Sequence, residues 1–310
     1  MRLLLGVFVA AVWVPAMASA CTEDPVLAEV ALELSAREVL DGAALAEALE
    51  IAGSDQRHGW ARRFRRRAAA DEWLRELPRD APLSCGRAHR DDSVLVVATA
   101  RAGSLTIDAG RARATVAEGF REAHLVVRDG DGALHRLALT DGEASLEGVP
   151  RPLVVQLVAT GPRGPRPVAE RRVGRRRPTA RVVGSGTLAD RLEALREVHG
   201  ASPLRSNRLL VEAARRHAEA ICREGVAAHE LDSDPESRLA SRGIRARVVG
   251  EAVARVAPAD DPLNALVRSP GHAAALVDRR FTDVGIGEVT AHGRRCVVVS
   301  LAAWPRYVGR

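Results

Sequence analysis

The chain is long and basic, with the composition of a globular protein and few aromatic residues. It has 310 residues, of which 46% are hydrophobic and 28% charged, so it is globular with room for two or three cores of roughly 100–200 residues each. The net charge is +6, carried by arginine without lysine, and aromatic residues make up only 3%. Because stacking surfaces are scarce, nucleic acid is not expected as a partner.

The first twenty residues, MRLLLGVFVAAVWVPAMASA, have the pattern of an export signal. One positive charge precedes an apolar stretch, a proline breaks it, and small residues stand at Ala18 and Ala20. No later stretch approaches the ~20 apolar residues of a membrane span. We therefore expect a signal peptide at 1–20 and a mature protein that is secreted, periplasmic or lipid-anchored to the cell envelope.

Four cysteines follow the signal, and two interpretations of the first remain open. In one, Cys21 is the lipidated residue of a bacterial lipoprotein, and in the other it forms a disulfide with Cys85. An oxidising compartment favours pairing of the remaining cysteines, so Cys222 is predicted to bond Cys296. The spacing of the four matches no zinc knuckle.

Residues 21–173 change their hydrophobic period part-way. Helical spacing predicts a helical unit over 21–84, in which residues 60–77 form a helix with five arginines between Arg62 and Arg67. That run is either a solvated face or a patch for anionic surfaces. A period of two with glycine and aspartate turns predicts a β-sandwich-like domain over 85–173, without a catalytic group.

Residues 174–186 are rich in proline, glycine and arginine and are predicted to be a linker. The domain beyond it, 187–310, begins with a helix capped by Thr187 and a second helix to Glu224. His199 is predicted to lie at the end of a helix, and His217 is predicted to be a core residue. The chain is thus expected to be a multidomain α+β protein.

Three residues of the last domain are candidates for a site. His272 follows a Ser-Pro-Gly turn in the first turn of a helix, where the helix dipole favours a neutral ring. Glu251 lies in an apolar stretch and therefore requires a partner. His229 lies in an irregular segment.

Several stretches in this order carry a resemblance to a known family. They are LRS (204–206), AARRHAEAICREG (213–225), AAHE (227–230), RLASRGI (238–244), VGEAVA (249–254) and SPGHAAALVDRRFTDVGIG (269–287). Residues 187–303 thus resemble the CAP superfamily of cysteine-rich secretory, antigen 5 and pathogenesis-related 1 proteins, most of all its bacterial branch.

The resemblance implies an α-β-α sandwich and a cleft with two histidines and two acids, which match His229, His272 and Glu251. The second acid has no equivalent, and the Asn that usually follows the Gly-Glu pair is Ala252. In some relatives the histidines bind a divalent metal, so zinc at His229 and His272, with Glu251 as third ligand or partner of a ring, is one interpretation. A purely structural polar pocket is another.

These observations favour a non-enzymatic binding protein, and no residue is assigned a catalytic role. His229, Glu251 and His272 would bind a small apolar ligand, a peptide or a component of the cell envelope. The alternative is a metal-assisted hydrolase, a protease or esterase in which Glu251 activates water. A third hypothesis is an adaptor for anionic surfaces that uses residues 62–67 and 171–177.

Overall fold

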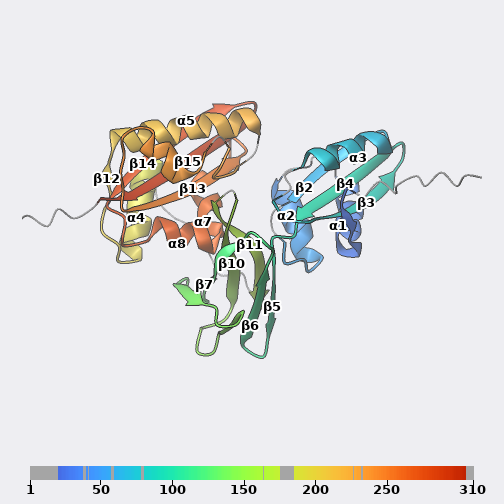
Figure 1. The fold of residues 1–310 in the computed structure, drawn as a ribbon, viewed down its shortest axis with the longest axis horizontal. Helices are drawn as coiled ribbons and strands as arrows, with labels where there is room; N and C mark the ends of the chain where they lie inside the picture. Colours follow the sequence, from blue (N-terminus) through green and yellow to red (C-terminus); the bar gives the residue numbers. More distant parts are fainter. Residues whose placement is uncertain are drawn as a thin grey trace, which may run out of the picture.

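The structure is a computed structural model that describes residues 20–37, 40, 42–56, 59–77, 80–162, 164–174, 185–225, 227–231 and 233–304. The predicted signal peptide up to residue 19 and most of the predicted linker, including Arg175–Arg177, lie outside these ranges. Figure 1 shows three units in chain order, coloured blue, green and yellow to red. Within the described part of the chain, no helix has the length and apolar character to cross a membrane.

The N-terminal unit is a small sheet with helices on both faces. Its sheet has the order β1-β3-β4-β2. The elements are β1 (Thr22–Glu23), α1 (Pro25–Ser35), α2 (Gly42–Ile51), β2 (Gly59–Phe64), α3 (Arg67–Glu76), β3 (Leu83–Arg90) and β4 (Ser93–Ala100). Helices α1 and α2 cover one face and α3 the other, because successive residues of β4 such as Leu95 and Val96 point to opposite cores.

The prediction of one helix over 60–77 is wrong in its first part. Residues Gly59–Phe64 form strand β2, in which Trp60 and Phe64 face the core that α3 covers and Ala61 faces the other. The alternation of side chains between two faces, which indicates a strand, extends over only the six residues of β2. The two arginines among them make this pattern too weak to be recognised from the sequence. The expected boundary at 84/85 also falls within β3, since both β3 and β4 belong to this first sheet.

The middle domain consists of two sheets around a shared core. A four-stranded sheet has the order β11-β10-β7-β8, and a three-stranded sheet has the order β5-β6-β9. The strands are β5 (Gly103–Asp108), β6 (Arg111–Val116), β7 (Arg121–Arg128), β8 (Leu134–Ala138), β9 (Glu143–Ser145), β10 (Leu153–Gly161) and β11 (Gly164–Val173). Both sheets contribute to the core, as Leu105 and Leu157 illustrate.

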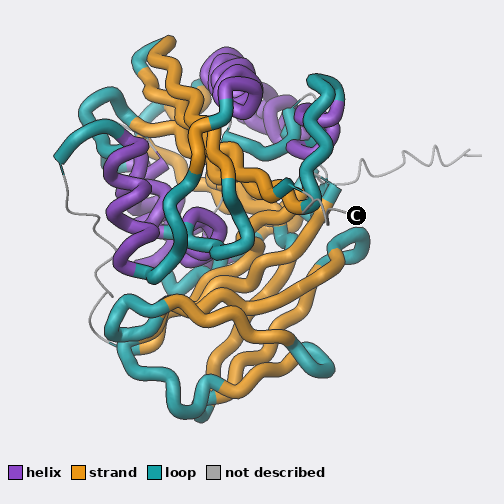
Figure 2. The backbone as a smooth tube through the Cα atoms, turned by 90° about the vertical axis from the view of Figure 1, so that its left-hand side faces the viewer, coloured by secondary structure: helices purple, strands orange, loops and turns teal. Residues whose placement is uncertain are grey.

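The C-terminal domain has a sheet of order β12-β14-β15-β13 between helices. Its elements are α4 (Leu188–Val198), β12 (Arg205–Ser206), α5 (Arg208–Glu224), α6 (Pro235–Ala240), β13 (Val248–Val256), α7 (Pro262–Arg268), α8 (Pro270–Leu276), β14 (Asp283–Ala291) and β15 (Arg294–Ala303). Strand β15 alternates: Val297 and Val299 pack toward α4, α7 and α8, and Val298 packs toward α5. Figure 2 shows the sheet running between helices.

The glycine spacing of β14 explains how α5 packs on this sheet. A Cβ added at Gly285 or Gly287 would lie 2.1–2.2 Å from backbone atoms of α5. The helix therefore approaches the strand more closely than any side chain would permit. The predicted disulfide between Cys222 on α5 and Cys296 on β15 is confirmed and joins the same two layers.

Two further expectations concern the cysteines and the linker. The structure joins Cys21 to Cys85, which is the disulfide alternative for the first cysteine. The adaptor hypothesis assigns residues 171–177 to an anionic surface, but the first two arginines of this stretch have partners within the protein. Arg171 and Arg172 belong to β11, where Arg171 donates to the Leu105 carbonyl at 2.9 Å and Arg172 forms an ion pair with Glu50.

Candidate functional site

A buried carboxylate lies at the centre of the candidate site. Glu251, on β13, has a side chain that is only 4% exposed, and it meets three side chains. Arg238 Nη2 lies 2.6 Å from its Oε2, while His229 Nδ1 and His217 Nε2 lie 3.0 and 3.6 Å from its Oε1. The partner that Glu251 requires is therefore a cluster of one guanidinium and two imidazoles.

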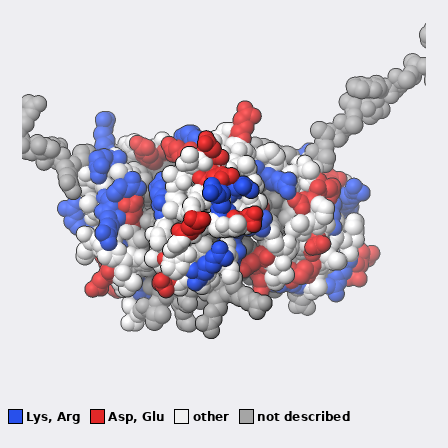
Figure 3. Space-filling view, turned by 90° about the horizontal axis from the view of Figure 1, so that it is seen from below, with Lys and Arg blue, Asp and Glu red and all other residues white. Residues whose placement is uncertain are grey.

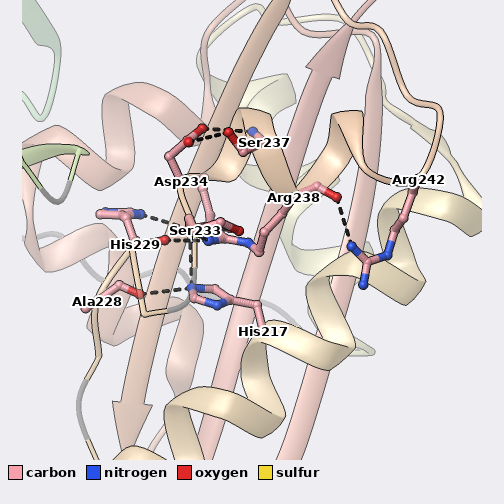
Figure 4. A network of polar contacts seen from close by, with 9 residues as sticks. His217, Ala228, His229, Ser233, Asp234, Ser237, Arg238 and Arg242 are labelled. Atoms are coloured by element: carbon pink, nitrogen blue, oxygen red, sulfur yellow. Dashed lines mark hydrogen bonds and ion pairs between the residues drawn. The ribbon is translucent and has the colours of Figure 1, made fainter.

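Arg238 and His217 reach Glu251 from two different helices. Arg238 projects from α6, which begins at Pro235 and is capped by Asp234, whose side chain accepts from the Ser237 N–H at 2.8 Å. The same guanidinium donates to the His229 carbonyl at 2.7 Å, and His217, on α5, donates from Nε2 to the Ala228 carbonyl at 2.9 Å. Figure 4 shows these contacts converging on the loop around His229. The loop lacks regular structure, so side chains fix its position.

The cluster sets the charge of its members. Burial alone would raise the pKa of Glu251, but the hydrogen bond from His229 and the nearby positive charge of Arg238 lower it below the usual 4.5. Burial lowers the pKa of His217 below 6.5, although the charge of Glu251 opposes that shift. The site therefore holds an ionised carboxylate and a neutral His217 near pH 7.

The structure brings the three sequence-predicted residues to one cavity. His229, Glu251 and His272 all line it, and the ring centroids of His229 and His272 are 6.0 Å apart at an interplanar angle of 66°. Because a carboxylate only accepts, His229 carries its proton on Nδ1 when it bonds Glu251, so Nε2 is the acceptor of its neutral ring. Their roles in binding stay predictions.

The cleft does not fit a three-ligand metal centre. A zinc site generally uses three or four protein ligands, and Glu251 is the third donor that the resemblance offers. Its two oxygens already accept from Arg238 and His229, and a metal cation there would face the guanidinium charge. Within the ranges the structure describes, no group of three His, Cys, Asp or Glu side chains is placed to hold a metal ion.

Sequence reasoning missed His217 and Arg238 as members of the site. His217 was interpreted as a core residue, and it is indeed 3% exposed, but it lies against Glu251. Arg238 stood in a stretch that carried the family resemblance without being singled out. A buried carboxylate in an apolar strand indicates that a cation is near, yet the sequence gives no means of choosing among so many arginines.

The cavity has a second wall that the sequence did not predict. Its volume is about 1160 Å³, and it lies between the C-terminal domain and the β7, β8 and β10 strands of the middle domain. His124 of β7 and His135 of β8 both line it. His135 Nε2 lies 2.7 Å from the buried Asp129 carboxylate, and burial lowers the pKa of His124.

The C-terminal domain matches a family model described as CAP, the cysteine-rich secretory protein family, over residues 189–301. Residues 189–301 form a CAP domain. This confirms the resemblance seen in the ordered sequence stretches. None of the curated proteins with which the sequence was compared matches it.

Solved structures similar to the chain include three bacterial proteins, each matching slightly more than a third of it. An extracellular protein with an SCP domain from Bacillus anthracis is 19% identical over 37% of this chain and 38% of its own, with a TM-score of 0.33. An outer surface protein from Borrelia burgdorferi is 20% identical over 38% of this chain and 90% of its own, with a TM-score of 0.35. A cysteine-rich secretory protein from Staphylococcus aureus is 16% identical over 36% of each chain, with a TM-score of 0.30.

Two of these three proteins are covered over little more than a third of their own length. The CAP domain of the present chain is joined to two units that lie outside the family match.

Proposed function

We propose that this protein is an exported, non-enzymatic binding protein whose ligand site is the cavity lined by His229, Glu251 and His272. The observation that carries this proposal is the state of Glu251. Its carboxylate is ionised, buried and bonded to Arg238 and His229, so it serves to fix the walls of the cavity. A fixed wall beside an open cavity supports recognition more than chemistry.

The chemistry of the cavity favours a peptide among the ligand classes considered. Its volume of about 1160 Å³ exceeds the ~300–1,000 Å³ of common small-molecule pockets, which supports a chain segment over a small apolar ligand. Apolar residues such as Val158 and Phe281 line it together with imidazoles and with the exposed Arg121 and Arg136. A component of the cell envelope that presents peptide would meet the same requirements.

Calorimetry on the mature chain tests the proposal with selected peptides as probes. Peptides displayed on phage are selected on the purified protein, synthesised and titrated into it. We expect one-to-one binding that weakens at least about tenfold in His272→Ala, equivalent to ~1.4 kcal/mol. His292→Ala is the matched control, because His292 is exposed in the turn between β14 and β15. If no peptide is enriched, or if His272→Ala binds as the parent does, the cavity is not a peptide site.

The alternative, a metal-assisted hydrolase, has one observation in its favour, the approach of two imidazoles to 6.0 Å. A general base must gain a proton near neutral pH, whereas the pKa of Glu251 is lowered. We expect no turnover of casein or simple esters with added Zn²⁺. Turnover that is lost in Glu251→Gln would establish the hydrolase instead. Zinc binding without turnover would indicate that His229 and His272 bind the metal weakly through their two imidazoles.

Export is proposed from the apolar N-terminal segment and is supported by the two disulfides. The mature form then begins at Cys21, and its thiol is bonded to Cys85 rather than acylated. Mass spectrometry of non-reduced peptides should find these two cysteines linked. A diacylglyceryl adduct on Cys21 would instead establish a lipid anchor at the cell envelope.

A further inference from the structure

A buried glutamine of the middle domain reaches into the CAP domain. Gln156, on β10, is 3% exposed, and both atoms of its amide group are used. Its Oε1 accepts from the Gly271 N–H at 2.9 Å and lies 3.0 Å from Ser269 Oγ, while its Nε2 donates to Glu170 Oε2 at 2.7 Å. Gly271 N–H can only donate, so the orientation of the amide is determined.

The residues that Gln156 holds are the start of the helix that carries His272. Ser269 is the N-cap of α8, and its Oγ accepts from the His272 N–H at 3.4 Å. One hydroxyl therefore connects the amide of His272 to the side chain of Gln156. A Cβ added at Gly271 would lie 3.3 Å from Gln156 Oε1 and from Val158, so the helix start packs tightly against β10.

The far end of α8 is held from within its own domain. Arg196 of α4 is completely buried and donates to the Leu276 carbonyl at 2.6 Å and to the Asp278 carbonyl at 3.3 Å. Donation to the last carbonyls of a helix is a common means of satisfying them. Helix α8 has seven residues, far fewer than an isolated helix requires, so its position depends on these contacts.

The orientation of Gln156 is in turn connected to the N-terminal unit. Glu170, on β11, is 6% exposed, and its N–H donates to the Asp55 carbonyl at 2.7 Å. Arg172 Nη2 lies 3.6 Å from Glu170 Oε1, and Nη1 of the same guanidinium pairs with Glu50 of α2. Polar contacts thus continue from the N-terminal unit through the middle domain to the start of α8.

We propose that Gln156 is a positioning residue through which the middle domain places α8, and with it His272, against the cavity. The binding site is then composite, because the β7–β8–β10 face supplies its second wall and Gln156 holds its second imidazole. The statement about binding rests on the function proposed above. The statement about position does not, and it can be tested without a ligand.

Hydrogen exchange on the full chain, with mass spectrometry of peptides covering 269–277, tests the position of α8. In Gln156→Leu we expect the amides of Gly271 and His272 to exchange about tenfold faster. The Gly271 N–H loses its acceptor, and the Ser269 hydroxyl that accepts from the His272 N–H is no longer held by Gln156. Thr160→Val is the matched control on the same strand: it removes a hydrogen bond to Glu122 at the surface and leaves α8 untouched. Exchange in α5 serves as the reference for global stability.

Selective ¹⁵N labelling of histidine supplies a readout that a merely structural contact would not move. The His272 ring resonances should shift in Gln156→Leu and in Ser269→Ala, while those of His292 stay unchanged. Ser269→Ala alters a partly exposed cap, so it remains informative if Gln156→Leu does not fold. Unchanged exchange at 269–277 and unchanged His272 resonances in either folded variant would overturn the proposal, whatever the peptide titrations show.

Discussion

The two imidazoles that face the cavity are held by different parts of the molecule. His229 is fixed from within the CAP domain, by Glu251 and Arg238, in contacts between α6, β13 and an irregular loop. His272 lies on a short helix whose start is held by Gln156 of the middle domain. The comparison teaches that the CAP domain alone secures one half of its cleft, whereas in the other half the start of the helix is held by a domain outside the family.

Acidification acts on the whole Glu251 cluster at once and is the strongest way to separate the two halves. The folded-state pKa values of His217 and Glu251 are both lowered, so the unfolded chain binds more protons as the pH falls. The free energy of unfolding should therefore fall below pH 6.5 through His217 and again below pH 4.5 through Glu251. Urea unfolding at a series of pH values measures this slope.

The matched variant for that measurement is His217→Gln, which retains a donor for the Ala228 carbonyl and does not titrate. It should flatten part of the decline that begins near pH 6.5, while His292→Gln should not. His124 and His199, whose pKa values are also lowered by burial, account for the slope that remains. A decline that is identical in the parent and in His217→Gln would contradict the assignment.

Removing Arg238 should destabilise the half of the cleft that the CAP domain holds. Arg238→Met leaves the buried Glu251 carboxylate without its closest cation, and breaking a buried pair costs about 3–5 kcal/mol. The control is Arg242→Met, four residues along, whose hydrogen bond is to the Arg238 carbonyl. Urea unfolding should place that control within about 1.5 kcal/mol of the parent. Equal losses in both variants would indicate that Glu251 does not require its ion pair.

Removing Gln156 should weaken the half that the middle domain holds, by a smaller amount. Gln156→Leu leaves the Gly271 N–H and the Glu170 carboxylate without this partner, and a buried polar group left unsatisfied costs about 1–3 kcal/mol. The midpoint of urea unfolding should shift accordingly. A variant as stable as the parent would show that water replaces the amide.

The exposed arginines of the N-terminal unit are expected to have the smallest effect. Figure 3 shows arginines and acidic residues interspersed over the face it presents. Arg65→Gln, Arg66→Gln and Arg67→Gln combined should leave stability within about 0.5 kcal/mol, since all three are exposed. Heparin retention should be unchanged. A large, salt-dependent loss of retention would instead support the hypothesis of an adaptor for anionic surfaces.

The sequence predicted those features of the fold that neighbouring residues decide. Thr187 caps its helix as expected, and Ser269 of the Ser-Pro-Gly turn caps the helix that carries His272. Strand β2 was mistaken for part of a helix, because six residues with two arginines carry too little periodicity to indicate a strand. The prediction that a helix begins at Pro270 needed only its own residues, whereas the position of that helix needs Gln156, which lies 115 residues before its partner Gly271.

By itself, the sequence determined the CAP family of residues 189–301, the disulfide between Cys222 and Cys296, and the three residues that gather at the cavity. Only the tertiary structure decided that Arg238 and His217 satisfy Glu251, and that Gln156 holds the helix of His272. The physical reason is the separation along the chain over which each kind of interaction acts. Caps and periodicity act between near neighbours, whereas a buried charge or amide is satisfied by whichever distant group the packed domains bring within hydrogen-bonding distance.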